Sequence, residues 1–160
     1  MPIETTCREY DQARAWWDRC RNVVSGSDAV KSAKTKYLSR LSGQTDEEYN
    51  GYLGGALFYG ASARTVEGYL GEIYCKPSKT IVPSVMLPWL ETITLEGLPL
   101  AVFEQALMVE TLAIGRYGVL VDSPATLVDS GRPYLAGYRA EAIINWPKDL
   151  RRPGSRSLIL

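Results

Sequence analysis

The stretch 97-GLPLAVFEQALMVETLAIGRYGVLVDSP-124 contains the change from helix to strand that decides the fold class. From Leu100 to Ile114, apolar residues recur every three or four positions, which is the spacing of one helix face. Pro99 is typical of a helix start and Gly115 of a helix C-cap. The apolar run 119–121 then predicts a short strand, which the following Asp-Ser-Pro ends.

Downstream of this stretch, residues 133–138 and 142–146 are two further strand or extended candidates. Upstream, the pattern is helical. A first helix is predicted from Thr5 or Thr6 to Val24, and a second, capped by Asp28, through Leu38.

The sequence Thr45-Asp46-Glu47-Glu48 is a capping box, so another helix should begin there and continue to about residue 60. After a break at 61–63, residues 66–73 continue on a separate helix. Several glycines in these two helices suggest that other helices approach closely there. The predicted fold is therefore α+β and predominantly helical, with a few short strands at the end.

Composition excludes several function classes. The chain has 160 residues and no net charge, with 18 basic and 18 acidic side chains, which disfavours a uniformly basic nucleic-acid coat protein. It contains no histidine, so the commonest general base and the Ser-His and Cys-His nucleophile pairs are missing. The spacing of Cys7, Cys20 and Cys75 fits no metal or redox motif and indicates a reducing compartment.

The remaining candidates for catalysis are weak. The glycine cluster at 115–118 follows a helix and precedes a strand, whereas a phosphate-binding loop needs the reverse order. Asp122 with Asp129, or Asp122 with Glu141, could serve a metal-dependent nuclease, but solvated loop carboxylates are the favoured interpretation. We therefore expect no enzyme activity, no cofactor and no bound metal.

Charge is distributed unevenly along the neutral chain. Residues 14–40 hold seven basic and two acidic side chains, whereas residues 84–114 hold four acidic side chains and no basic one. We call these segments the basic front and the acidic stretch. One segment could dock on the other, within a chain or between copies. The basic front could also contact phosphates, although a solvated helix face is the favoured interpretation for its lysines.

Trp16 and Trp17 are adjacent on the first predicted helix, so their side chains point about 100° apart. Either that helix has a wide core face, or one tryptophan lies at a contact between subunits, where tryptophan is enriched. The two interpretations are equally supported by the sequence.

The order of short motifs along residues 15–146 resembles the N-terminal part of tailed-bacteriophage portal proteins, in particular a portal-like group of domains of unknown function. The most specific portion runs from Gly-Arg-Tyr-Gly to Val-Asp-Ser-Pro and continues with Arg-Pro-Tyr and Ile-Asn-Trp. The residues that carry it are Gly115, Arg116, Gly118, Asp122, Pro124, Pro133, Tyr134 and Trp146.

The resemblance implies a structural virion protein of the head-tail connector, used in capsid assembly and in DNA packaging and ejection. Portal subunits form a ring at one capsid vertex and contact capsid or scaffold proteins, the terminase and head-tail adaptors. The matched region corresponds to the wing and carries no catalytic residue. Its expected location is the portal vertex of the virion, and the host cytoplasm during assembly.

By the same resemblance, residues 1–146 form a wing region. Residues 147–160 are basic and without periodicity, which predicts a flexible tail. Portals of this group are several times longer, so the chain resembles a truncated portal. The alternative is a small DNA-binding or regulatory phage protein that uses its basic front and tail. The sequence contains no apolar run of membrane-spanning length and no export signal.

Overall fold

The structure is a computed structural model that describes residues 4–123 and 132–146. It confirms the predicted class, because helices dominate and one small antiparallel sheet follows them. The helices are α1 (Arg8–Ser25), α2 (Ser27–Ser32), α3 (Asp46–Gly55), α4 (Ala61–Ile73), α5 (Leu87–Leu90) and α6 (Leu100–Ile114). The strands are β1 (Tyr117–Asp122) and β2 (Tyr134–Arg139), and short 3₁₀ turns cover Lys34–Lys36, Ser84–Met86 and Ala140–Ala142.

Helix α1 supplies the largest part of the core. It begins at Arg8, slightly later than predicted, and ends at Ser25. Gly26 follows in the C-cap position with a φ of 92°, which glycine adopts without strain. Tyr10 and Trp17 are buried and meet edge to face, with ring centroids 5.6 Å apart. They pack with Ile114 and Ala140, so the core joins α1 to the end of α6 and to the turn after β2.

The second predicted helix is shorter than expected. Asp28 does not cap it: α2 begins at Ser27 with Gly26 at the N-cap position, and Asp28 lies in the first turn. The helix stops at Ser32, and the chain continues as a 3₁₀ turn that Lys34 enters with a positive φ of 47°. The lysine-rich segment therefore forms a short helix and a 3₁₀ turn rather than one continuous helix face.

The capping box of α3 is confirmed in detail. The Glu48 amide donates to Thr45 Oγ1 at 3.3 Å, and the Thr45 amide donates to Glu48 Oε2 at 2.8 Å. The Thr45 hydroxyl also donates to Glu48 Oε2, at 2.9 Å. The two bonds that the Thr45 amide and hydroxyl donate to the carboxylate lower the pKa of Glu48. Helix α3 ends at Gly55, so the break before α4 lies at 56–60 and not at 61–63 as predicted.

The expectation of close helix approach at the glycines is wrong. A Cβ added at Gly54, Gly55, Gly68 or Gly71 would meet no atom within 4 Å. These glycines face open space, so α3 and the outer side of α4 carry an uncovered surface of small residues.

Helix α6 leads into the sheet as predicted, although Pro99 occupies the N-cap position and not the first turn. Gly115 caps the helix in the left-handed region, with φ 83°. Strands β1 and β2 then pair antiparallel, with Tyr117 opposite Arg139 and Asp122 opposite Tyr134. The Tyr117 ring lies over Gly137, where an added Cβ would come 2.0 Å from the tyrosine hydroxyl.

Residues 142–146 do not form a strand, which was one of the two alternatives for this segment. The 3₁₀ turn at Ala140–Ala142 redirects the chain toward the start of α1, where the Cys7 amide donates to the Ile144 carbonyl at 3.1 Å. Ile143 is buried, and its side chain covers Gly118. The segment therefore packs against the core instead of pairing with β2.

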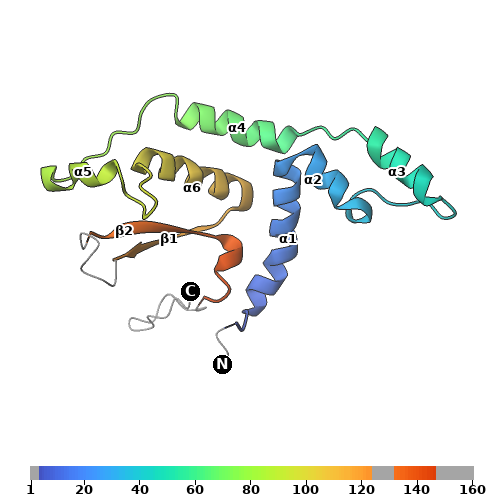
Figure 1. The fold of residues 1–160 in the computed structure, drawn as a ribbon, viewed down its shortest axis with the longest axis horizontal. Helices are drawn as coiled ribbons and strands as arrows, with labels where there is room; N and C mark the ends of the chain where they lie inside the picture. Colours follow the sequence, from blue (N-terminus) through green and yellow to red (C-terminus); the bar gives the residue numbers. More distant parts are fainter. Residues whose placement is uncertain (1–3, 124–131, 147–160) are drawn as a thin grey trace.

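Figure 1 shows the arrangement of these elements. Helix α6 lies along the hairpin, α4 runs above α6, and α1 stands beside both. Helices α2 and α3 extend away from this centre as an arm. Within the described residues, no helix combines the length and the apolar character that crossing a membrane requires.

Candidate functional site

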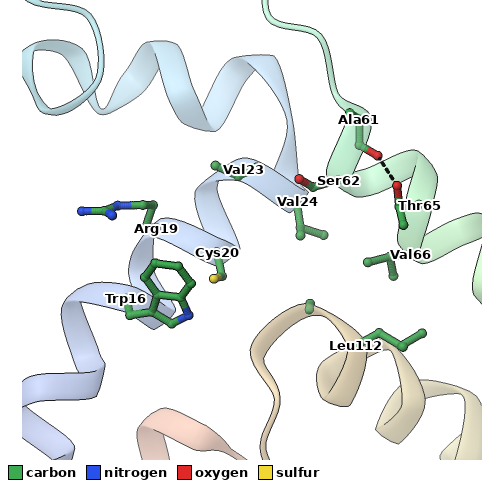
Figure 2. A pocket seen from close by; sticks show the side chains of 11 residues that line it. Trp16, Arg19, Cys20, Val23, Val24, Ala61, Ser62, Thr65, Val66 and Leu112 are labelled. Atoms are coloured by element: carbon green, nitrogen blue, oxygen red, sulfur yellow. Dashed lines mark hydrogen bonds between the residues drawn. The ribbon is translucent and has the colours of Figure 1, made fainter.

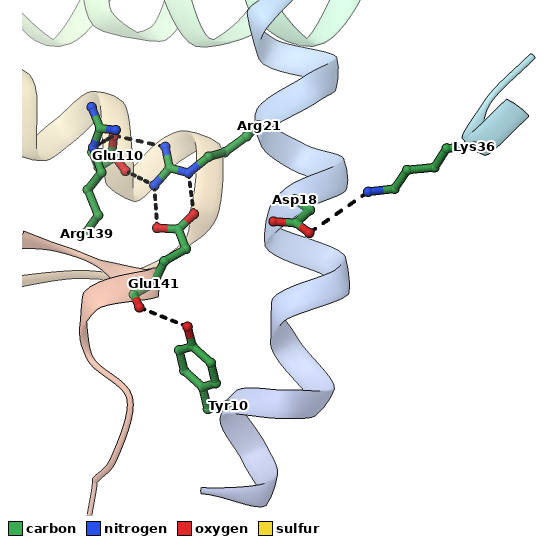
Figure 3. A network of polar contacts seen from close by, with 7 residues as sticks. All are labelled: Tyr10, Asp18, Arg21, Lys36, Glu110, Arg139 and Glu141. Carbon is green, nitrogen blue, oxygen red and sulfur yellow. Dashed lines mark hydrogen bonds and ion pairs between the residues drawn. The ribbon is translucent and has the colours of Figure 1, made fainter. Parts of the chain in front are cut away.

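The polar centre of the molecule is a cluster of charged side chains around Arg21 of α1 (Figure 3). Arg21 donates to both carboxylate oxygens of Glu110 on α6, at 3.1 and 2.8 Å. It also donates twice to Glu141 in the turn after β2, from Nη2 at 2.8 Å and from Nε. Arg139 adds a second cation, with its Nε 3.4 Å from Glu110 Oε1. One arginine thus joins three separate parts of the chain.

Hydrogen bonds fix the ionisation of this cluster. The bonds that Arg21 donates to Glu141 and then to Glu110 raise the pKa of Arg21, and the same bonds to Glu141 lower the pKa of that carboxyl despite its partial burial. A general acid at neutral pH needs a raised carboxyl pKa, and Glu141 shows the opposite shift. The cluster is therefore suited to hold α1, α6 and the hairpin together.

Two residues of the portal-like motif, Arg116 and Trp146, meet in space. The Arg116 guanidinium carbon lies 3.8 Å from the centre of the Trp146 ring, a close cation–π contact. Burial lowers the pKa of Arg116. Trp146 packs against the core cluster around Tyr10 and Trp17, so the contact ties the end of the described chain to the turn after α6.

The other motif residues occupy structural positions. Gly115 is the C-cap of α6, and Gly118 accommodates the side chain of Ile143. Asp122 accepts a hydrogen bond from the Tyr134 hydroxyl at 3.1 Å, which raises the pKa of Tyr134. Pro133 is half-buried immediately before β2. Pro124 lies outside the described residues, as do Asp129 and the predicted basic tail at 147–160.

The acid pair considered for a nuclease is not brought together. Asp122 lies at one end of the hairpin and Glu141 follows the other end, with five strand residues, or roughly 17 Å, between them. Among residues 4–123 and 132–146, no group of three or more Cys, Asp or Glu side chains lies close enough to hold a metal ion.

The two adjacent tryptophans have different environments. Trp17 is buried in the core, whereas Trp16 is 59% exposed, with Arg19 stacked 5.8 Å from its ring centre. Of the two residues considered for a subunit contact, only Trp16 is therefore available on the surface.

Trp16 lines an open apolar pocket between three helices (Figure 2). The pocket has a volume of about 470 Å³. Its walls are the second half of α1, the first two turns of α4 and the end of α6. In Figure 2, Val24 and Val66 are directed into the space above Leu112. An apolar hollow of this kind, left open on the surface, is typical of a contact site.

The basic front and the acidic stretch meet within the chain, at Arg21 and Glu110. Other charges of the basic front are also engaged: Arg40 pairs with Asp46 at 2.7 Å, and Lys31 donates to the Gly54 carbonyl at 3.0 Å. Lys36 lies 4.0 Å from Asp18. These contacts neutralise part of the basic front within the chain. Less of its positive charge is therefore available to a partner than the sequence suggests.

Sequence reasoning missed the Arg21 cluster and the pocket. The sequence suggests Glu141 as a possible nuclease ligand and Arg21 as one of the seven basic residues of the basic front, without pairing the two. The complementary charge of the two segments was the one available signal, and it did not identify which residues pair. No sequence pattern predicted the pocket, because its walls come from three distant segments of the chain.

Comparisons with known proteins give no family assignment. No protein-family model matches the chain, and no curated protein matches it.

Proposed function

We propose that this chain is a structural subunit that acts through contacts between protein surfaces, as a portal-like protein of the phage head-tail connector. The proposed function involves no chemical reaction, so no covalent bond is made or broken. The subunits form a ring at the portal vertex of the virion, and the described region takes the role of a wing.

The observation that carries the proposal is the large amount of apolar surface without a covering. Among the described residues, seventeen large apolar side chains are exposed and nine apolar residues are buried. None of the large buried side chains is fully enclosed. Single exposed apolar residues are ordinary, but a chain that exposes more large apolar side chains than it buries is suited to assembly with partners.

The motif residues support the same proposal. Arg116 with Trp146, and Asp122 with Tyr134, hold the hairpin and the segment after it. These contacts stabilise shape, which is what a connector subunit requires from its wing. The proposed partners are other copies of the subunit and, by the resemblance, capsid or scaffold proteins, the terminase and adaptor proteins. Assembly would take place in the host cytoplasm.

The direct test is the mass of the purified chain in solution. Size-exclusion chromatography with light scattering, over a wide concentration range and at low salt, should give an oligomer whose closed rings appear by electron microscopy. A strict monomer at high concentration would overturn ring formation by this chain.

DNA binding through the basic front is a weaker proposal, because Arg21, Lys31 and Arg40 are already engaged within the chain. Binding to phosphates releases counterions, so duplex affinity should fall steeply on a log-log plot against salt. A flat plot would remove DNA as a direct partner.

A further inference from the structure

Strand β1 has an unpaired edge. The hairpin is a two-stranded sheet, and the outer side of β2 meets the segment around Thr94 through a parallel bridge at Leu135. Among residues 4–123 and 132–146, no segment pairs with the outer side of β1. Such an edge presents a row of free backbone N–H and C=O groups, which is a template for a further strand.

The hydrogen bonds of β2 show which backbone groups lie on the free edge. The Leu135 amide donates to the Ile93 carbonyl at 2.8 Å, so the backbone groups of Leu135 are directed away from β1. Because this direction alternates along a strand, the even-numbered residues of both strands bond across the hairpin. The odd-numbered residues of β1 are therefore directed outward: Tyr117, Val119 and Val121.

The side chains of these three residues lie on the side of the hairpin that α6 covers, since the Tyr117 ring meets Phe103 of α6 edge to face. Helix α6 leaves the rest of this edge open, because Val119 is 45% exposed and Val121 is 68% exposed. Proteins commonly protect an edge with lysine, proline or a bulge, and β1 contains none of these. The edge is thus apolar and open to pairing.

We propose that β1 pairs with β1 of a second copy in antiparallel orientation, with Val119 of each copy opposite Val119 of the other. All three outward-directed residues pair in this register, because Tyr117 then lies opposite Val121. Each of these pairs exchanges two backbone hydrogen bonds, so the contact contains about six bonds. The product is a four-stranded sheet with the strand order β2-β1-β1-β2.

The edge is complementary to itself, which favours a second copy as the partner. Apolar side chains oppose apolar ones on the α6 side, and cross-strand pairs of β-branched residues stabilise sheets. Asp122, the only charged residue of β1, lies opposite Arg116 of the other copy, so no like charges face each other. A shift of the register by two residues would place one outward-directed residue of each copy beyond the end of the partner strand.

This contact goes beyond the proposed ring. A two-fold contact uses the same surface on both copies and closes after two of them, so it does not continue around a ring. Pairing of two short strands is also small compared with stable interfaces, which bury about 1,200–2,000 Å². We therefore expect a dimer that forms reversibly as the protein concentration rises.

Amide hydrogen exchange, measured by NMR, tests the alternation directly. In dilute protein the amides of Tyr117, Val119 and Val121 should exchange rapidly, whereas β2 protects those of Gly118 and Leu120. In concentrated protein, shown by sedimentation to be dimeric, exchange at the three outward positions should slow at least tenfold.

Two results of this experiment would overturn the pairing. Protection at the outward positions that does not depend on concentration would mean that the edge is covered within one chain. Rapid exchange at these positions in a dimer would mean that the copies associate through another surface.

Substitution at the two-fold axis is a second test. Val119→Lys places like charges directly opposite each other and should weaken dimerisation at least tenfold in sedimentation velocity, whereas the β-branched Val119→Thr should retain it. Val102→Lys is the matched control, because Val102 of α6 is 46% exposed and lines a hollow beside β2, away from the free edge. Equal effects of the two lysine substitutions would contradict pairing at Val119.

The outcomes separate this contact from the proposed portal-like function. Rings that form without protection of the β1 edge would retain the function and reject the pairing. A dimer with a protected edge that never forms rings would retain the pairing and reject ring assembly.

Discussion

The guanidinium carbon of Arg116 lies 3.8 Å from the centre of the Trp146 ring, although 30 positions separate the two residues in the sequence. The contact closes the hairpin against α1, because Trp146 also packs on the core that contains Tyr10 and Trp17. Both residues are among those that carry the proposed resemblance to portal proteins, and their contact gives each of them a physical role.

Breaking this pair should destabilise the fold. We expect Arg116→Ala to lower the free energy of unfolding by about 1–2 kcal/mol, since a desolvated cation–π contact contributes about that much. A double-mutant cycle with Trp146→Leu, measured by urea unfolding, should give a coupling energy of similar size. Arg64→Ala removes the exposed contact with Tyr59 and is the matched control, with an expected loss below about 0.5 kcal/mol. A coupling energy near zero for Arg116 and Trp146 would contradict this assignment.

Removing the cation from the central cluster should have a larger effect. Arg21→Met leaves the partly buried carboxylates of Glu110 and Glu141 without their shared partner. We expect a loss of about 2 kcal/mol in urea unfolding, below the roughly 3–5 kcal/mol of fully enclosed pairs. Neutralising both carboxylates in the same protein, with Glu110→Gln and Glu141→Gln, should recover part of the loss.

Arg14→Met is the control for this series, because Arg14 is exposed and its replacement should change stability by no more than about 0.5 kcal/mol. If both arginine substitutions cost the same, the Arg21 cluster does not hold the elements together.

The lowered pKa of Glu141 predicts how stability depends on pH. The folded carboxyl binds its proton less readily than the unfolded one, whose ordinary pKa is 4.5. Its stabilising effect is therefore complete above pH 4.5 and is lost as the pH falls through the lower folded value. Urea unfolding of the natural protein should weaken below pH 4.5 more steeply than that of Glu141→Gln. Parallel curves for the two proteins would contradict the role of Arg21 in ionising Glu141.

Two glycine substitutions should act in opposite directions. Gly137→Ala forces the Tyr117 ring away, because the added Cβ would lie 2.0 Å from its hydroxyl and 2.8 Å from Cζ, and a shift of that ring also disturbs its edge contact with Phe103. We expect a loss of about 1–3 kcal/mol, as for other overpacked sites. Gly68→Ala, inside α4 and facing open space, should instead stabilise by about 0.5–1 kcal/mol. Thermal unfolding of both variants checks the signs, and a stabilising Gly137→Ala would be the contrary result.

Much of the helical architecture was predictable because helices are encoded by neighbours in sequence. The Thr45 and Glu48 capping box, the Gly115 C-cap and the 100–114 helix all depend on residues within one or two turns of each other. Local sequence patterns predicted two other segments less well. The helix predicted through Leu38 ends early at Ser32, and residues 142–146, predicted as a strand or an extended segment, form no strand and pack on the core.

The candidate site was predictable only in part. Sequence identified Arg116 and Trp146 separately through a resemblance, but not their contact. It placed Trp16 and Trp17 on one helix without distinguishing the buried ring from the exposed one. That choice depends on where α6 and the 140–146 segment lie, since they cover only one side of α1.

Taken alone, the amino-acid order determined the helical segments, the strand after Gly115 and the opposite charges of two distant segments, because these depend on local hydrogen bonds and composition. The tertiary structure alone decided that Arg21 binds Glu110 and Glu141, 89 and 120 positions away, and that three helices leave a pocket beside Trp16. The physical reason is that such contacts gain energy only after the chain has closed long loops, so no short window of sequence contains them.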